Sequence, residues 1–169
     1  MNVEETQALA DAMRAGLRRA AQGVYVISAC NSAAERCAMT ASSVTSVSME
    51  PPSLLVCANQ TASLYAVLQQ KRPFCVNILA EGMEDISNLC AGGADGEARF
   101  GLGDWRRAEP QGVPYLAGSE ANFFCQPVSE MQHGTHLICV ADVTQVLVTS
   151  GPAAPLVYTA GGYAGVTRR

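Results

Sequence analysis

The chain has little charge. Only 15% of its 169 residues are acidic or basic, and the formal net charge is −4. Basic residues occur at most in pairs, which excludes the basic patch that a nucleic-acid interface needs. No apolar run approaches the roughly 18–20 residues that cross a bilayer, and the acidic start at residues 1–5 is unlike a signal or transit peptide. We expect one cytoplasmic domain over residues 1–169 that binds neither nucleic acid nor membranes.

Signatures of nucleotide loops and metal sites are missing as well. No G-x-G-x-x-G fingerprint is present, and Gly92, Gly93 and Gly96 lack the Lys that closes a phosphate loop, so we expect a plain connection there. His133 and His136 are the only histidines, and no third ligand of matching spacing accompanies them, so we expect no metal site. A Cys-His nucleophile would need an electropositive cysteine, which the sequence does not offer. The plain alternative is a histidine hydrogen-bonded at the start of a strand.

The seven cysteines are odd in number and form no C-x-x-C pair. Five of them lie in apolar, strand-like runs, where a free thiol behaves as a small hydrophobic side chain. Reduced cytosolic thiols are therefore expected. Because 49% of the residues are hydrophobic and so few are charged, we also expect a second subunit to cover part of the surface. This predicts a homo-oligomer.

The first part of the chain predicts a helix followed by a strand hairpin. Residues 4–21 carry apolar side chains at helical spacing, which indicates an amphipathic helix that docks on another surface. Residues 24–30 form a continuous β-branched and aromatic run, which is typical of a buried strand. The chain would then turn at residues 31–36 and return as a strand over residues 37–48.

Strands dominate the rest of the chain. A short helix is expected after a cap at Thr61 or Ser63, and another over residues 83–90. Residues 91–96 are expected to form a loop, and residues 105–118 an irregular segment. Hairpin-like strand separations favour a mainly β fold, an antiparallel β-barrel with flanking helices, over a parallel doubly wound sheet. The further strands expected are residues 53–58, 74–79, 121–126, 137–148 and 155–158.

Residues 39–63 are rich in hydroxyl groups and carry a single charge, Glu50. The hydroxyls belong to Thr40, Ser42, Ser43, Thr45, Ser46, Ser48, Ser53, Thr61 and Ser63. Such a lining suits a neutral, planar, hydrogen-bonding ligand, because each hydroxyl can donate and accept. The alternative is a strand that faces water at a sheet edge. Polar and apolar residues alternate imperfectly, so both faces are partly polar, as the wall of a ligand site would be.

Three further residues suggest ligand contacts. Asn59 and Ser63 could bind a phosphate through a side chain and a helix N-terminus. Arg99, which precedes Phe100, is either a ligand clamp or part of an ordinary surface pair.

Five segments, in this order, resemble the short-chain flavin reductases, the reductase components of two-component flavin-dependent monooxygenases. They run through nearly the whole chain and comprise residues 20–27, 39–54, 74–79, 99–100 and 134–136. Their order and spacing make the resemblance specific. There are two departures. Ala38 stands where a glycine often precedes the Met-Thr pair, and Gly134-Thr135-His136 replaces the commoner Gly-Asp-His.

The resemblance implies an FMN-binding split barrel over residues 23–160 after a helix at residues 1–21, working as a homodimer. It implies an NAD(P)H:flavin oxidoreductase that reduces FMN or FAD with NADH or NADPH and supplies reduced flavin to a partner monooxygenase. His136 would lie where the nicotinamide nucleotide binds and is the one suspected catalytic residue. The residues that it assigns to cofactor binding are Thr40, Ala41, Ser42, Ser43, Ser46, Val47, Ser48, Asn59, Ser63, Arg99, His136 and Tyr163.

Few catalytic residues are expected in such an enzyme. Hydride moves from nicotinamide C4 to flavin N5, and the cofactors carry that chemistry. The protein need only stack the two rings within about 3–3.5 Å and exclude water. Two alternatives stay open: a non-catalytic flavin-binding or redox-sensing barrel that keeps its cofactor, and a flavin-bound oxidase with its own organic substrate. The small chain disfavours the oxidase, because no proton acceptor is evident.

Overall fold

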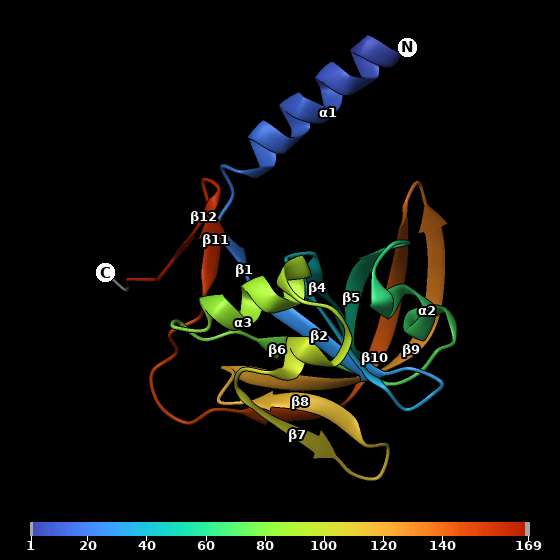
Figure 1. Ribbon diagram of the computed structural model, residues 1–169, viewed down its shortest axis with the longest axis vertical. Helices are drawn as coiled ribbons and strands as arrows, with labels where there is room; N and C mark the ends of the chain where they lie inside the picture. The colour runs from blue at the N-terminus through green and yellow to red at the C-terminus, as the bar shows by residue number, and fades with distance from the viewer. Residues whose placement is uncertain (1, 168–169) are drawn as a thin grey trace.

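A seven-stranded antiparallel sheet forms the body of the computed structural model, which describes residues 2–167 (Figure 1). Its strands lie in the order β3-β2-β6-β9-β10-β5-β4. Their bounds are β2 Tyr25–Cys30, β3 Arg36–Ala41, β4 Val44–Met49, β5 Pro52–Asn59, β6 Phe74–Ile78, β9 Ala121–His133 and β10 His136–Val148. The prediction of a mainly β, split-barrel-like fold is confirmed. The strand at β9 is longer than the expected residues 121–126, because it continues to the hairpin turn before β10.

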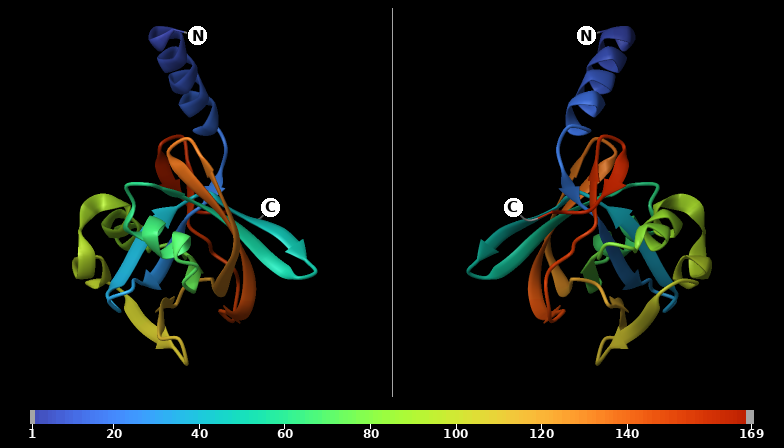
Figure 2. Two further views of the ribbon diagram at one scale, coloured as in Figure 1. Left: turned by 90° about the vertical axis from the view of Figure 1, so that its right-hand side faces the viewer. Right: turned by 90° about the vertical axis from the view of Figure 1, so that its left-hand side faces the viewer.

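The sheet is split between two strands that are neighbours in sequence. β3 pairs only with β2 and β4 pairs only with β5, yet Ser42 and Ser43 alone join β3 to β4. A two-residue link has a short reach, so the sheet must curl until its two edges approach each other. In Figure 2 the β4–β5 hairpin, coloured cyan to teal, extends from one side of the body. The single strand predicted for residues 37–48 is therefore wrong, because it breaks at these two serines.

The sheet is buried on both faces around β2. Ile27 and Ala29 face one cluster of buried residues, together with Leu64 of the helix α2 (Ser63–Gln69). Val26 faces a second cluster on the opposite side. This two-sided burial confirms the buried strand expected here. The expected cap of α2 is wrong, because its N-cap is Ala62, which makes no side-chain cap hydrogen bond.

Short helical turns and a small hairpin cover the second face. They are α3 (Glu84–Asn88), the π-helical turn η1 (Leu89–Gly93), the 3-10 turn η2 (Gly96–Phe100), and the strands β7 (Asp104–Ala108) and β8 (Val113–Ala117). The irregular segment expected at residues 105–118 is in fact this β7–β8 hairpin. The loop expected at residues 91–96 is helical as far as Gly93, with Gly92 at a φ of 113°.

A buried amide ties the β7–β8 hairpin to the sheet. The side chain of Asn77 on β6 is fully buried, and its Nδ2 donates to Val26 O at 2.7 Å and to Ser28 Oγ at 3.0 Å. Its Oδ1 accepts from Leu116 N and from Asn122 Nδ2, both at 2.9 Å. One side chain thus joins β2, β6, β8 and β9. A buried polar group with this many partners fixes the relative position of the elements that it joins.

The helix α1 (Val3–Leu17) projects away from the barrel (Figures 1 and 2). Asn2 and Glu5 form a capping box at its start, and none of its residues is buried. The chain re-enters the body through β1 (Gln22–Gly23), which pairs with β11 (Val157–Thr159), and β11 pairs with β12 (Gly162–Ala164). The helix is shorter than the expected residues 4–21. Within residues 2–167, no helix has both the length and the apolar character needed to cross a membrane.

We predict that Asn77→Ala lowers the free energy of unfolding by about 3 kcal/mol, because it leaves several buried donors and acceptors without a partner. Urea denaturation of the two proteins would measure the difference. Gln111→Ala, which removes an exposed amide from the β7–β8 turn, is the matched control and should change stability by less than about 0.5 kcal/mol. Equal effects of the two substitutions would contradict the role given to Asn77.

Candidate active site

A cavity opens where the sheet splits. Its volume is about 360 Å³, and its wall begins with Thr40, Ala41, Ser42 and Ser43. Most of the rest of its lining comes from the end of β5, the start of β10, the η1 turn and Arg99. We call this the central cavity. The structure therefore gathers seven of the predicted site residues in one place: Thr40, Ala41, Ser42, Ser43, Asn59, Arg99 and His136.

The hydroxyl wall lies on an unpaired strand edge. β3 has a strand neighbour on one side only, so backbone groups on its other edge are free to bind other partners. Thr40 is half-buried and its Oγ1 donates to the carbonyl of Ser87 at 2.6 Å, which joins this edge to α3. Ser42 and Ser43 are exposed. The hydroxyl-rich segment thus lines a cavity at a sheet edge at this point, and its contact with a ligand stays a prediction.

Arg99 supplies a positive charge that carbonyl groups hold in place. Its Nε donates to Ala94 O at 2.7 Å, and its Nη1 donates to Ala38 O at 2.6 Å and to Ser63 Oγ at 3.3 Å. The nearest carboxylate, that of the fully exposed Asp95, is 3.7 Å from Nη2. Carbonyl acceptors orient a guanidinium without cancelling its charge, and an exposed ion pair contributes little. Arg99 is therefore available to an anionic group of a ligand.

Asn59 and His136 lie side by side in the lining of the central cavity. They are register partners on β5 and β10. The Oδ1 of Asn59 accepts from the backbone N and the hydroxyl of Thr61, both at 3.0 Å. The ring of His136 lies at the surface, with its Nδ1 3.0 Å from Thr135 Oγ1. The β9–β10 hairpin thus presents this histidine to the cavity rather than burying it.

Tyr163 borders a second cavity of about 530 Å³ that shares Thr40, Ala41 and Ser42 with the first. The Tyr163 hydroxyl is 2.9 Å from both Ser87 Oγ and Asn88 Oδ1, and its ring packs edge-on against Tyr158. The predicted residue Ser63 lies beside Arg99 in a third cavity of about 570 Å³, and Arg99 also lines the central cavity. We call these three neighbouring cavities the groove.

The structure places three predicted site residues away from the groove. Ser46 lines a separate cavity with Tyr25 and Phe123, Val47 is half exposed on β4, and Ser48 Oγ accepts from the backbone N of Glu50 at 2.9 Å. These residues lie beyond the link at Ser42 and Ser43, on the other edge of the sheet. Their contact with a cofactor stays a prediction.

The sequence did not identify the part of the cavity lining that the η1 turn supplies. Ala91 and Gly92 line the central cavity, although this segment was expected to be only a connection. The consecutive glycines at 92 and 93 were the available signal, because Gly92 has a positive φ that other residues rarely adopt. Ser87 had no signal of its own, because its role depends on contacts with distant segments.

The thiols near the groove are neutral at physiological pH. Burial raises the pKa of Cys90 to about 11, and burial also raises the pKa of Cys57. Neither side chain is therefore a thiolate nucleophile. All seven cysteines are free thiols. His133 and His136 face each other across the hairpin, and residues 2–167 contain no group of three or more metal-binding side chains.

Comparison with known proteins decides the family. Residues 17–167 match the family described as flavin reductase like domain. The chain belongs to this family, which confirms the resemblance. It is 38% identical to FMN reductase (NADH) RutF of Methylorubrum extorquens, over 91% of this chain and 74% of that protein. It is also 38% identical to the reductase component of the FADH(2)-dependent resorcinol hydroxylase of a Rhizobium species, over 89% of this chain and 83% of that protein.

Solved structures of flavin reductases have the same architecture. The NADH:FAD oxidoreductase SgcE6 of Streptomyces globisporus, in complex with NAD and FAD fragments, has a TM-score of 0.83 at 26% identity and covers 92% of this chain and 91% of its own. BorF, the flavin reductase component of a bacterial two-component tryptophan halogenase, has a TM-score of 0.84 at 28% identity. The match covers 95% of this chain and 99% of the BorF chain.

The groove of this flavin reductase-like chain fits a flavin. The described residues that line the central cavity include no Asp or Glu, and Arg99 is their one fixed charge. Hydroxyl groups and free backbone groups offer neutral hydrogen bonds to a planar ring system, while Arg99 favours a phosphate. Reduction places negative charge on a flavin, and a cavity without carboxylates does not oppose it.

We predict that stability falls as pH rises above about 9, because buried thiols resist ionisation. Burial, with a smaller effect from Cys139, raises the pKa of Cys125 from 9.0 to about 12. Below pH 9.0 the Cys125 thiol keeps its proton in both the folded and the unfolded state, and its full contribution to stability is present. Between pH 9.0 and about 12 the thiol ionises only in the unfolded state, so this contribution is lost as the pH rises. Urea denaturation at about pH 8 and about pH 10.5 should show a smaller loss for Cys125→Ala than for the unmodified chain. Equal losses would contradict this.

Proposed function

We propose that this chain transfers a hydride from NADH to FMN or FAD and supplies the reduced flavin to a partner monooxygenase. The single observation that carries the proposal is the groove at the split, where a hydroxyl wall and Arg99 meet and the described residues that line the central cavity include no carboxylate. Family membership and the relatives named FMN reductase (NADH) RutF and resorcinol hydroxylase reductase component support it. The first of these names favours NADH over NADPH.

Different residues of the groove would bind different parts of the flavin and of the nicotinamide nucleotide. Thr40 and Ser42, with the free edge of β3, would hold the ring system through neutral hydrogen bonds. Arg99, with Ser63 and Asn59 beside it, would hold the flavin phosphate. When bound, the flavin supplies the N5 atom that accepts a hydride from nicotinamide C4. His136 lines the same cavity as the hydroxyl wall and would orient the nicotinamide nucleotide.

The groove favours exchange of flavin over permanent retention. It is open to solvent along the split, and Ser42, Ser43 and His136 on its walls are exposed. Neutral hydrogen bonds to an exposed ring give moderate affinity, since water competes for each of them. A flavin that is to be released after reduction needs a site of moderate affinity. The non-catalytic flavin-binding alternative instead requires flavin that survives dialysis and is not reduced by NADH.

A homodimer belongs to the proposal. β4 is an edge strand with a neighbour on one side only, and such an edge pairs readily with another chain. Large apolar side chains are exposed on α1, β4 and the end of β10, which supports a covering partner. They are Leu9, Met13, Leu17, Val47, Met49, Val146, Leu147 and Val148. The seven free thiols support a reducing compartment such as the cytoplasm.

NADH oxidation followed by absorbance should require added flavin, with FMN, FAD and riboflavin tested separately. We predict that Thr40→Val lowers kcat/KM for flavin about tenfold, because it removes the hydroxyl that joins the wall to Ser87. His136→Ala should raise KM for NADH with little change in flavin affinity. Thr144→Val removes a like hydroxyl, which donates to Phe124 O at 3.1 Å and lines none of the cavities of the groove; it is the matched control and should behave as the unmodified chain. Absence of NADH and NADPH oxidation with every flavin would overturn the proposal.

We predict that the chain elutes at twice its 17.7 kDa mass and that Val47→Asp with Met49→Asp shifts it to the monomer. Two carboxylates in a buried interface carry a large desolvation cost, whereas on the free surface they carry little. Light scattering coupled to size exclusion would measure both masses, and far-UV circular dichroism would check that the variant is folded. A monomeric unmodified chain would rule out the dimer.

A further inference from the structure

Ser87 on α3 joins the two cavities that share the end of β3. This serine is fully buried. Its carbonyl oxygen accepts from Thr40 Oγ1 at 2.6 Å, and its Oγ lies 2.9 Å from the hydroxyl oxygen of Tyr163. Thr40 lines both the central and the second cavity, and Ser87 and Tyr163 line the second. One residue therefore connects a wall of the central cavity with β12, which is distant in sequence.

Residues of α3 use the protons of both neighbouring hydroxyl groups. A carbonyl oxygen only accepts, so the bond to Ser87 takes the single hydroxyl proton of Thr40. The Tyr163 hydroxyl also has one proton, and Ser87 Oγ and Asn88 Oδ1 both lie 2.9 Å from it. Either partner withholds that proton from a ligand, while lone pairs remain on both hydroxyl oxygens. Thr40 and Tyr163 therefore face the cavities as hydrogen-bond acceptors.

The hydroxyls farther along the wall have no such fixed direction. Ser42 and Ser43 are exposed, so their hydroxyls can rotate to donate or to accept. The end of β3 thus places a fixed acceptor, Thr40, close to groups that can donate. The edge of an oxidised flavin ring is complementary to this combination, because its single N–H group, at N3, lies between two carbonyl groups.

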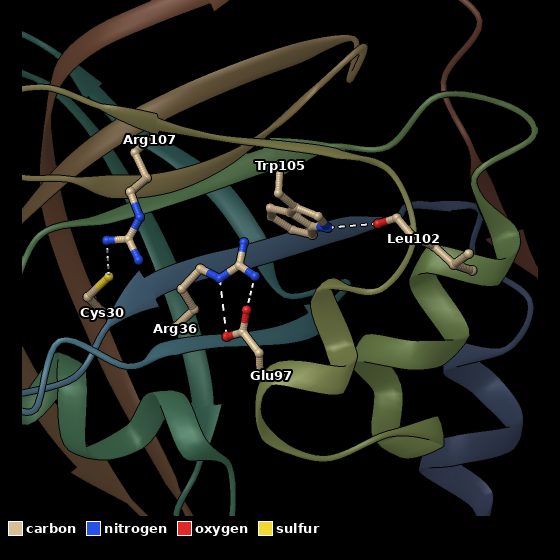
Figure 3. A network of polar contacts seen from close by, with 6 residues as sticks. All are labelled: Cys30, Arg36, Glu97, Leu102, Trp105 and Arg107. Atoms are coloured by element: carbon tan, nitrogen blue, oxygen red, sulfur yellow. Dashed lines mark hydrogen bonds and ion pairs between the residues drawn. The ribbon is translucent and has the colours of Figure 1, made fainter.

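The third cavity of the groove offers a different set of polar groups. In it Arg36 forms an ion pair with Glu97, and Arg107, which also lines it, has its Nη1 3.7 Å from Cys30 Sγ (Figure 3). Arginines and carboxylates both line this cavity, so a charged ligand meets attraction and repulsion together. Around Ser87 the polar groups are neutral, and they distinguish ligands by the direction of a hydrogen bond instead.

We infer that Ser87 is a positioning residue for the flavin ring, because it makes Thr40 an acceptor that selects the N3–H group of that ring. The inference rests on the proposed flavin reduction and extends it to a residue behind the hydroxyl wall. An acceptor hydroxyl stabilises a ring N–H and is repelled by a ring carbonyl. The direction of the Thr40 hydroxyl therefore sets the register of the ring along β3.

The side chain of Ser87 contributes through Tyr163 rather than through the helix. Alanine has a higher helix propensity than serine, so α3 itself gains nothing from a hydroxyl at this position. A buried hydroxyl is costly unless it has a hydrogen-bond partner, and the partner here is Tyr163. Tyr163 packs edge-on against Tyr158 of β11, with the ring centroids 5.5 Å apart. Ser87 therefore also holds the aromatic border of the second cavity against α3.

FMN and FMN methylated at N3 test the acceptor role of Thr40, with Kd measured by quenching of flavin fluorescence. The unmodified chain should bind the methylated flavin about tenfold more weakly, because the methyl group removes the only ring N–H. Thr40→Val offers no acceptor to either flavin, so its two Kd values should agree within about threefold. Thr40→Ser, which keeps the hydroxyl, and the control Thr144→Val should discriminate as the unmodified chain does. The same ratio in the unmodified chain and in Thr40→Val would overturn the inference.

A double-mutant cycle tests whether Ser87 acts through Tyr163. Ser87→Ala and Tyr163→Phe should each raise the Kd for FMN about threefold, because each removes one hydroxyl of the same contact. The double substitution should raise it no further than either single one. Ser119→Ala is the matched control and should leave the Kd unchanged. Ser119 is also buried, but within residues 2–167 its Oγ has no hydrogen-bond partner, and it lines none of the three cavities.

Two further results separate this inference from a structural role and from the proposed function. Independent effects of Ser87→Ala and Tyr163→Phe, or a loss of stability in urea without any change in Kd, would leave Ser87 only a structural role and overturn the inference. NADH oxidation with FMN by the unmodified chain is measured in parallel. Reduction of FMN without discrimination against the methylated flavin overturns this inference alone, whereas the absence of both FMN binding and FMN reduction overturns the proposed function as well.

Discussion

The two-residue link between β3 and β4 is the constraint on which the rest of the structure depends. The link joins the first and last strands of a seven-stranded sheet, and the three peptide steps from Ala41 to Val44 reach only about 10 Å. The sheet must curl for its edges to come this close, yet the edges do not pair. Strand edges that are close together but unpaired leave backbone donors and acceptors beside a cavity. The groove therefore follows from the topology rather than from any single side chain.

Hydrogen bonds to residues behind the groove hold its walls in position. The carbonyl of Ser87 accepts from Thr40, and the side chains of Ser87 and Asn88 lie within hydrogen-bond distance of Tyr163. Behind these, Asn77 joins β2, β6, β8 and β9 through five polar partners that include the thiol of Cys75. The hydrogen bonds within the sheet cannot fix the elements outside it, so buried side chains must do so. The site is consequently rigid where it meets the barrel and exposed where a ligand would enter.

The sequence predicted local features well but predicted poorly which segments of the chain pair or pack with one another. The apolar run before residue 31 indicated a strand buried on both faces, and the hydroxyl-rich stretch indicated a cavity wall. The break at Ser42 and Ser43 has no Gly or Pro to mark it, because the change of partner from β2 to β5 causes it. The β7–β8 hairpin contains charged residues and a proline, and its position depends on Asn77 and the buried core. Ala91 and Gly92 belong to the site only because the fold brings η1 to the hydroxyl wall.

The charge of the groove agrees with the proposal that one site both reduces and releases a flavin. Arg99 is held by carbonyl oxygens, so it attracts a phosphate whatever the redox state of the ring. The ring would lie farther along, where hydroxyl and backbone groups are neutral and none of the cavity-lining residues between 2 and 167 is a carboxylate. Neutral donors stabilise the negative charge of the reduced ring. An ion pair in the same place would bind the reduced flavin more tightly. Separating the charged anchor from the neutral ring site therefore favours the reaction while keeping the product exchangeable.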